Sequence, residues 1–411
     1  LFGCVARLRA GAKTRSGRGC CSRLSALSDP NPQCPAGELN HMRRLVLVIG
    51  VAALVVLAGC ADMPSDEPEV ETDDTAADVN GDEPEDTDAS DEETEADDTD
   101  DTNDTITEQP REVDGELEIH HIDVGQADAT LIITPADETI LIDTGDWRQS
   151  GEGVIEYLEA HDIDRIDHLV ATHGHADHIG GHDEIIAWAE TEGDGIGTAY
   201  DSGVAHTSQT YERYLDAVEE YDVELLIVEE GDELPIEGNV TGLVVNPPAG
   251  ESGSDLHYNS VSLALEFGEF RYLTTGDAET DAEQRMVKEW SAELDADVYH
   301  AGHHGSSTSS TDPFLDAVSP EIAVISSAYD SQYGHPHDEV LTAFADRDID
   351  TYWTGVHGDI ILTTDGNGSV NVTTSDEFSS DPDELLDEKP TDDDASLVPP
   401  TVGIQHSGVA P

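Results

Sequence analysis

Four side chains that can bind a metal ion fall within six residues in the segment 173–178, which reads HGHADH. His173, His175, Asp177 and His178 offer imidazole nitrogen and carboxylate oxygen, which suit divalent cations such as zinc, manganese or iron. Ligands this close on one turn can serve two ions about 3.5–4 Å apart. His173 and His175 can then face one ion, and Asp177 and His178 its neighbour. The segment predicts half of a two-metal hydrolase centre, and a polar histidine-rich loop is the alternative.

Apolar, strand-like runs lead into this segment and into three further groups with the same ligand types. The run 166–171 precedes HGHADH, and the runs 270–273, 296–299 and 322–326 precede the others. The three groups contain Asp277, the pair His303 and His304, and the pair His335 and His337. Loops at strand ends that converge on one edge of the sheets would bring all four groups together. Asp277 could instead cap the helix-like segment 278–290.

The order of these groups resembles the metallo-β-lactamase fold superfamily, whose signature is HxHxDH. The segment DVGQADA at 123–129 and the two downstream histidine groups narrow the resemblance to the ComEC/Rec-type branch, the soluble domain of the bacterial DNA-uptake channel ComEC. The resemblance covers five motifs in order, from about residue 116 to 372. It implies an α/β fold of four layers (αββα), in which two sheets lie between helical layers.

The resemblance also implies a role for each matching residue. One ion is held by His173, His175 and one of His303 and His304; the second is held by Asp177, His178 and His335; Asp277 bridges both. The resemblance does not choose between His303 and His304, and it gives the other a contact with phosphate or the leaving group. Asp177, Asp277 and His304 are therefore expected to be catalytic.

Three further residues are expected beside the ligands without touching an ion. Asp123 is expected to accept the distal N–H of a ligand histidine, and Asp128 and His337 are placed in the same outer layer. Many superfamily members carry another histidine ligand before the strand that leads to the bridging aspartate. Here that position reads YNSVSL at 258–263, and the nearby His257 is a rival candidate.

Two divalent cations, zinc or manganese, bridged by a carboxylate suit in-line displacement at phosphorus. The resemblance thus implies a metal-dependent phosphodiesterase or nuclease that acts on extracellular DNA. A hydrolase of another ester or amide, such as a phosphorylcholine ester or a β-lactam, is the alternative, and so is a non-catalytic binding module of the same fold. Ser306 and Ser307 lie outside any Gly-x-Ser-x-Gly motif and are interpreted as capping or phosphate-contacting residues.

The charge of the chain is extreme. The net charge is −75, and residues 1–44 hold 8 of the 17 basic residues but only 2 of the 92 acidic ones. This composition is typical of a protein adapted to very high salt, where self-repulsion is screened. An acidic surface for a basic partner is the alternative. The chain has no basic stripe, which argues against ordinary electrostatic binding of nucleic acid, but that opposition is weak at molar salt.

The N-terminal part resembles a lipoprotein signal. Residues 42–60 combine two arginines, an apolar run at 45–57 and the sequence LAGC, in which Cys60 would be lipidated. We therefore expect an extracytoplasmic domain attached to the cell membrane through lipid, with no stable protein partner. An ordinary cleaved signal or an uncleaved anchor is the alternative. No other apolar segment is long enough to cross a bilayer, so the channel region of ComEC is not expected here.

The expected domain organisation follows from composition. Residues 1–41 are interpreted as a spurious extension, 42–60 as the signal peptide, 61–114 as an acidic disordered linker, 115–374 as the hydrolase domain and 375–411 as an acidic disordered tail. Strands are predicted at 116–122, 129–133, 139–142, 166–171, 261–267, 270–274, 322–325 and 360–363, and near residues 243, 298 and 352. Helices are predicted at 153–160, 182–190, 207–221, 279–290 and 339–345.

Overall fold

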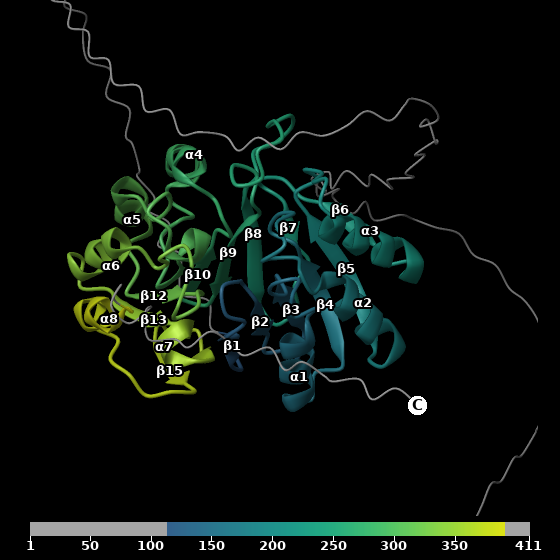
Figure 1. Ribbon diagram of the computed structural model, residues 1–411, viewed down its shortest axis with the longest axis horizontal. Helices are drawn as coiled ribbons and strands as arrows, with labels where there is room; N and C mark the ends of the chain where they lie inside the picture. Colours follow the sequence, from purple (N-terminus) through teal and green to yellow (C-terminus); the bar gives the residue numbers. More distant parts are fainter. Residues whose placement is uncertain (1–112, 391–411) are drawn as a thin grey trace, which may run out of the picture. The chain divides into compact units, whose positions relative to one another are not determined.

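The computed structural model describes residues 113–390, which contain two β-sheets and the helices that cover them (Figure 1). The expected extension, the signal peptide with Cys60 and nearly all of the acidic linker lie outside the described residues. Among the described residues, no helix combines the length and the apolar character that a membrane span requires.

The first sheet has eight strands in the order β15-β14-β1-β2-β3-β4-β5-β6. Strands β3 to β6 are parallel neighbours, and the other pairs in this sheet are antiparallel. The strands are β1 (Leu117–His121), β2 (Thr130–Ile133), β3 (Thr139–Ile142), β4 (Arg165–Val170), β5 (Gly195–Asp201), β6 (Leu225–Ile227), β14 (Ile360–Thr364) and β15 (Val370–Thr374).

The second sheet has seven strands in the order β13-β12-β11-β10-β9-β8-β7. Strands β10 to β13 run parallel, so their carboxyl ends lie at one edge. The strands are β7 (Glu233–Leu234), β8 (Val240–Asn246), β9 (Ser262–Phe267), β10 (Phe270–Thr274), β11 (Val298–His300), β12 (Ile322–Ile325) and β13 (Asp350–Trp353).

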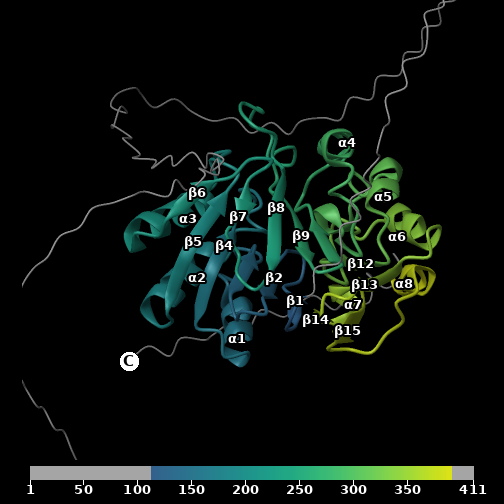
Figure 2. The same ribbon diagram turned by 180° about the vertical axis from the view of Figure 1, so that it is seen from behind.

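Helices cover the outer face of each sheet, and Figures 1 and 2 show the two helical groups on opposite flanks. An apolar cluster that includes Val154, Leu158 and Ile185 joins the first group to the first sheet, and one that includes Met286 and Phe344 joins the second group to the second sheet. The first group is α1 (Glu152–Ala160), α2 (His182–Thr191) and α3 (Gln209–Tyr221). The second is α4 (Thr280–Trp290), α5 (Asp312–Val318), α6 (Asp338–Ala345) and α8 (Pro382–Glu388), and the short α7 (Thr354–His357) follows β13.

A third apolar cluster lies between the sheets and is supplied by both. Ile119 and Ile140 come from the first sheet, and Leu265 and Phe267 from the second, and all four side chains are buried. Successive side chains of a strand point to opposite faces, so one face of each sheet meets the other sheet while its opposite face meets helices. The four-layer αββα sandwich expected from the sequence is thus confirmed.

The acidic disordered tail was expected to begin at residue 375, but the folded region continues beyond that residue. Residues 382–388 form α8, and Leu385 is fully buried against α6 in the second helical layer. Asp381 caps this helix by accepting the N–H of Asp383, and Pro382 starts it. The two leucines of PDELLDE supply enough apolar surface for one docked turn, which the average composition of the tail conceals. The folded region therefore extends at least to Glu388.

Strand β5 was not predicted because its sequence GIGTAYD has the glycine content of a loop. Gly197 lies so close to β4 that a Cβ atom there would be 2.3 Å from the carbonyl oxygen of Asp167. The glycine is therefore needed for close approach of two parallel strands, a packing requirement that strand propensity does not reveal.

Candidate metal centre

The HGHADH segment leaves the carboxyl end of β4 and turns sharply before α2. The loop is fixed by backbone hydrogen bonds, in which Gly180 N–H donates to Gly145 O (2.9 Å) and Trp147 N–H donates to Ala176 O (2.9 Å). A Cβ atom at Gly180 would lie 2.1 Å from the backbone nitrogen of Trp147. A glycine is required here because two backbone segments pass in direct contact.

Asp277 lies at the centre of the site, in the turn between β10 and α4. Its backbone N–H donates to Ser260 Oγ (3.1 Å), which fixes the turn. Oδ2 faces His173 Nε2 at 3.5 Å and His303 Nε2 at 3.6 Å, and Oδ1 faces His178 Nε2 at 3.1 Å and His304 Nε2 at 4.0 Å. Oδ2 also lies 3.9 Å from His257 Nε2, so each carboxylate oxygen faces its own group of imidazoles, the geometry that a bridging ligand needs.

We call the group around Oδ2 the open half of the centre. It contains His173, His175 and His257, whose ligand atoms lie with that of Asp277 within 4.8 Å of one another. His173 Nε2 and His175 Nδ1 are 2.8 Å apart, and His257 Nε2 is 3.9 Å from Asp277 Oδ2. The side chains of His175 and His257 are only partly buried. This half is accessible to solvent, and the rival candidate His257 belongs to it.

We call the group around Oδ1 the buried half. It contains Asp128, His178 and His304, which meet Asp277 within the same 4.8 Å limit. All four residues are at most 3 % exposed. Asp177 lies at the rim of this half, where its Oδ2 is 3.5 Å from His304 Nε2 and its side chain is 33 % exposed.

The backbone at the histidine pair separates the two halves. His303 (φ 51°) and His304 (φ 56°) both adopt the left-handed conformation inside a short 3₁₀ turn, Gly302–Gly305. A non-glycine residue in this region costs on the order of 1–3 kcal/mol. The conformation turns the two rings to opposite sides, so that His303 joins the open half and His304 the buried half. His303 Nε2 thus faces Asp277 Oδ2 and His304 Nε2 faces Oδ1.

Carboxylates lie next to the Nδ1 atoms of the histidines in the buried half. His178 Nδ1 donates to Asp143 Oδ2 (2.7 Å), and Thr172 donates to the same carboxylate through its backbone N–H (2.9 Å) and its hydroxyl (2.7 Å). His304 Nδ1 donates to the carbonyl of Ser326 (3.0 Å) and lies 3.6 Å from Asp128 Oδ1. These contacts direct the Nε2 atom of each ring toward Asp277.

The pKa values of the histidines are shifted in opposite directions in the two halves. Burial lowers the pKa of His178, but the charges of Asp277 and Asp143 outweigh it and raise that pKa well above the ordinary value; Asp128 and Asp277 raise the pKa of His304 in the same way. In the open half, burial and neighbouring histidines lower the pKa of His173 well below its usual range. Burial and His257 lower the pKa of His175 to about 4.

The residues present fit a pair of divalent cations. His178 Nε2, His304 Nε2 and Asp277 Oδ1 are buried and have no hydrogen-bond partner, although buried polar atoms are nearly always paired. The ligand atoms of these three residues lie within 4.8 Å of one another, and the donors are nitrogen and oxygen only. Such a set suits zinc, manganese or iron.

The structure places the remaining predicted residues outside both halves. His335 Nδ1 is 3.3 Å from Gln126 Nε2, and its ring lies 5.7 Å from that of His303, so it stands beside the ligands without joining either group. His337 Nδ1 accepts the N–H of Ser307 at 2.8 Å, which links two loops. Asp123 is exposed and accepts the N–H of Gly125 at 3.0 Å. No contact between Asp123 and a histidine is found in the described residues. Asp143 and Asp128, and not Asp123, lie next to the Nδ1 atoms of the histidines in the buried half.

Sequence reasoning missed Asp143 and Glu279 as partners of the ligand histidines. Asp143 follows β3 in the pattern ILIDTG, which offered the same strand-end signal as Asp277 and could have identified it. Glu279 Oε1 is 3.5 Å from His257 Nδ1 and 3.2 Å from His303 Nδ1, two residues after Asp277. Nothing in the sequence pattern singles it out.

Comparisons with known proteins agree with this arrangement. Residues 122–328 match the model of the family described as "Metallo-beta-lactamase superfamily". "ComE operon protein 3" of Bacillus subtilis is 30% identical over 62% of this chain and 33% of its own length. "Competence protein ComA" of Neisseria gonorrhoeae is 30% identical over 60% and 31%, and "Recombination protein 2" of Haemophilus influenzae 28% identical over 54% and 26%.

The chain thus spans about a third of the length of these relatives or less. The matched segment contains both halves of the centre and the loops that carry them. On this match and this fold, the chain belongs to the metallo-beta-lactamase superfamily, with relatives among the ComEC-type competence proteins.

Proposed function

We propose that the chain is a two-metal phosphodiesterase that acts on DNA. Members of its superfamily are usually metal-dependent hydrolases. The observation that carries the proposal is the Asp277 carboxylate, whose two oxygens face separate groups of imidazoles. The names of the relatives refer to competence and recombination, which favours a nucleic-acid substrate over a β-lactam or another ester.

In this proposal His173, His175, His303 and His257 supply the ligands of the first ion. Asp177, His178 and His304 supply those of the second, and Asp277 is shared. Zinc and manganese both suit these donors. Two cations held there would lower the pKa of a shared water and polarise the phosphoryl oxygens. The protein residues fix the ligand rings through Asp143, Asp128 and Glu279, and the glycine-rich loops bring the backbone close to the substrate.

The acidic composition fits this function only at high salt. At low ionic strength the net charge of −75 repels DNA over long distances, and at about 1 M salt the Debye length falls to about 3 Å. We therefore propose a halophilic enzyme whose kcat/KM on DNA rises with salt, opposite to the behaviour of basic nucleases.

The test is hydrolysis of end-labelled single- and double-stranded DNA by the purified chain in molar KCl with zinc or manganese. A generic phosphodiester reporter and the Asp277→Ala variant are measured beside it. Cleavage that the variant lacks would support a metal-dependent nuclease. Turnover of the reporter with intact DNA would move the substrate to a small phosphoester, and no turnover of either would favour another bond or a binding role.

We also propose that residues 42–60 are a lipoprotein signal and that Cys60 carries lipid. The domain 115–388 would then act outside the cytoplasm, attached to the membrane through an acidic linker. Labelling with a radioactive fatty acid tests this: wild type should incorporate label and sediment with membranes. The Cys60→Ser variant should do neither, and equal membrane association of both proteins would contradict lipid anchoring.

A further inference from the structure

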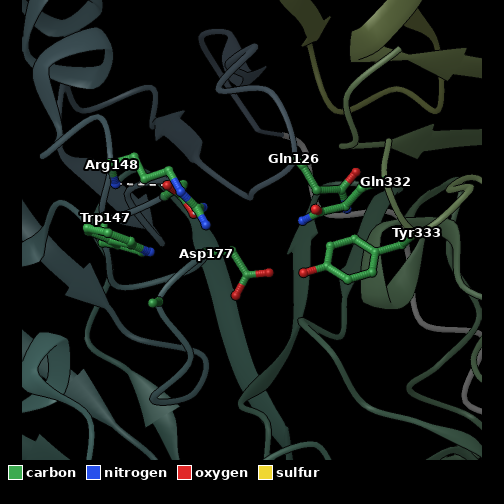
Figure 3. Close-up of a pocket in the computed structure, with 8 residues that line it drawn as sticks. Gln126, Trp147, Arg148, Asp177, Gln332 and Tyr333 are labelled. Atoms are coloured by element: carbon green, nitrogen blue, oxygen red, sulfur yellow. Dashed lines mark hydrogen bonds and ion pairs between the residues drawn. The ribbon is translucent and has the colours of Figure 1, made fainter. Parts of the chain in front are cut away.

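A cavity of about 180 Å³ lies beside Asp177, at the rim of the buried half (Figure 3). Its walls include Gln126, Trp147, Arg148, Gln332 and Tyr333. Pockets for drug-sized ligands usually measure about 300–1,000 Å³, so this cavity suits a single small ring system. Because Asp177 belongs to both the cavity and the metal centre, a group bound here would adjoin the bond that is hydrolysed.

Two exposed aromatic side chains stand on opposite walls of this cavity. Figure 3 shows Trp147 on one wall, Tyr333 on the other and Asp177 between them. Trp147 is 46% exposed and Tyr333 58% exposed. They are two of the five large apolar side chains exposed in the described residues, in a chain with only 5% aromatic residues. Exposed aromatics gathered at one small cavity indicate a ligand with a flat ring.

Both walls are fixed to loops of the metal centre. The backbone of Trp147 donates to Ala176 and touches Gly180, which fixes the backbone of Trp147 to the loop that carries the HGHADH segment. The Tyr333 ring lies 5.7 Å from the His335 ring, and Gln126 Nε2 lies 3.3 Å from His335 Nδ1. Each aromatic residue is therefore attached to a segment that lies beside the metal centre.

Polar groups in the cavity suit the edge of a nucleobase. Gln126 and Gln332 each offer an amide that can donate and accept, and Gln126 Oε1 is buried without a hydrogen-bond partner. The guanidinium of Arg148 lies 4.9 Å above the Trp147 ring and forms an ion pair with Asp146 at 2.9 Å. A cation is scarce in this acidic chain, and here it lies next to an aromatic ring beside the proposed phosphodiester site.

We propose that this cavity binds one nucleobase of a single-stranded nucleic acid, next to the phosphodiester that is hydrolysed. The base stacks against both Trp147 and Tyr333, and the two glutamine amides meet its edge. Stacking on aromatic side chains contributes about 1–3 kcal/mol per base and tolerates every base. It does not depend on charge, so it allows an acidic protein to bind DNA at molar salt. A base in a duplex cannot enter, so the substrate is a single strand or a strand with an unpaired base. This inference rests on the proposed function.

The first experiment compares cleavage of an oligonucleotide with cleavage of the same oligonucleotide carrying abasic sugars. The purified chain is loaded with manganese in molar KCl, and Phe378→Ala serves as the control because Phe378 is also exposed, at 41%, but outside the cavity. Trp147→Ala and Tyr333→Ala should each lower kcat/KM on the base-bearing strand by about 5-fold or more, the weakest expected stacking effect. They should leave the abasic strand unchanged. Equal losses on both strands, or no loss on either, would overturn the inference.

The second experiment measures binding without cleavage. Fluorescence anisotropy of a labelled phosphorothioate oligonucleotide gives Kd for base-bearing and abasic strands. The wild-type protein and Phe378→Ala should prefer the base-bearing strand, and Trp147→Ala and Tyr333→Ala should lose the preference. If the protein prefers the base-bearing strand in this binding experiment but hydrolyses no strand in the first experiment, the proposed function fails and the base subsite stands. If strands are hydrolysed without any base preference, the subsite fails and the proposed function stands.

Discussion

The two halves of the centre use the same imidazole chemistry in opposite surroundings. In the buried half, His178 and His304 are fully enclosed and face the carboxylates of Asp143 and Asp128. In the open half, His175 and His257 are partly exposed and face other histidines and Glu279. The buried half is therefore preorganised by charge, whereas the open half can admit solvent and substrate. Asp277 joins the two.

The largest difference between the halves should appear when a ligand histidine is removed. In His178→Ala the Asp143 carboxylate loses its charged partner inside the protein, and breaking a buried pair typically costs about 3–5 kcal/mol. The His175→Ala substitution leaves no buried carboxylate without its partner. The free energy of unfolding should therefore fall by less than about 1 kcal/mol. Urea unfolding of both variants in chelator and molar KCl measures this directly. Equal destabilisation would show that the two halves do not differ in this way.

Metal affinity should respond to the carboxylates behind the buried histidines. Asp143→Asn keeps the shape of the side chain but weakens the 2.7 Å hydrogen bond from His178. Loss of such a partner typically lowers metal affinity by 10–100-fold. Competition with a coloured chelator measures the affinity of the protein for each of the two ions separately. Only one of these two binding affinities should change in Asp143→Asn. A shift of both steps would indicate that the halves are coupled through more than Asp277.

Proton release on metal binding should also separate the halves. The raised pKa of His178 and His304 keeps both protonated in the metal-free protein near neutral pH, so an ion must displace their protons; His173 and His175, with lowered pKa, are already neutral. Affinity in the buried half should therefore rise with pH, while the open half stays constant between pH 6 and 8. Protonated His178 and His304, paired with carboxylates, also stabilise the folded metal-free protein. This contribution to stability is fully present below about pH 6.5 and is lost as the pH rises through the raised pKa of each histidine. Calorimetry in buffers of different ionisation enthalpy counts the protons.

The smallest effect is expected at Glu279, which serves the open half. Its side chain is 36% exposed, so salt screens its attraction for His257 and His303. Glu279→Gln should weaken one metal-binding step by less than about 10-fold, below the range for a typical outer-layer partner. The absorption spectrum of the cobalt-loaded protein should shift because two ligand rings lose a fixed orientation. A loss as large as that in Asp143→Asn would contradict the division between halves.

Most strands and the strand-end loops could be predicted because short apolar runs mark buried strands, whereas the four layers were implied by the resemblance to the metallo-β-lactamase fold superfamily. The sequence also placed the ligand groups on those loops, for example Asp277 after β10. The sides taken by His303 and His304 could not be predicted, because they depend on two consecutive left-handed residues. Asp143 was missed although it follows β3 with the same strand-end signal as Asp277, and Glu279 was missed because nothing in the sequence pattern singles it out. Strand β5 and helix α8 were missed because close packing, and not local composition, decides them.

The central claim is that Asp277 joins two ions, and metal content per chain tests it most directly. The purified protein, dialysed in molar KCl against buffered zinc or manganese, is analysed by plasma mass spectrometry beside Asp277→Ala and the exposed control Phe378→Ala. The account predicts two ions in wild type and in the control, and no more than one in Asp277→Ala. Fewer than one ion per wild-type chain, or two ions retained without Asp277, would contradict it.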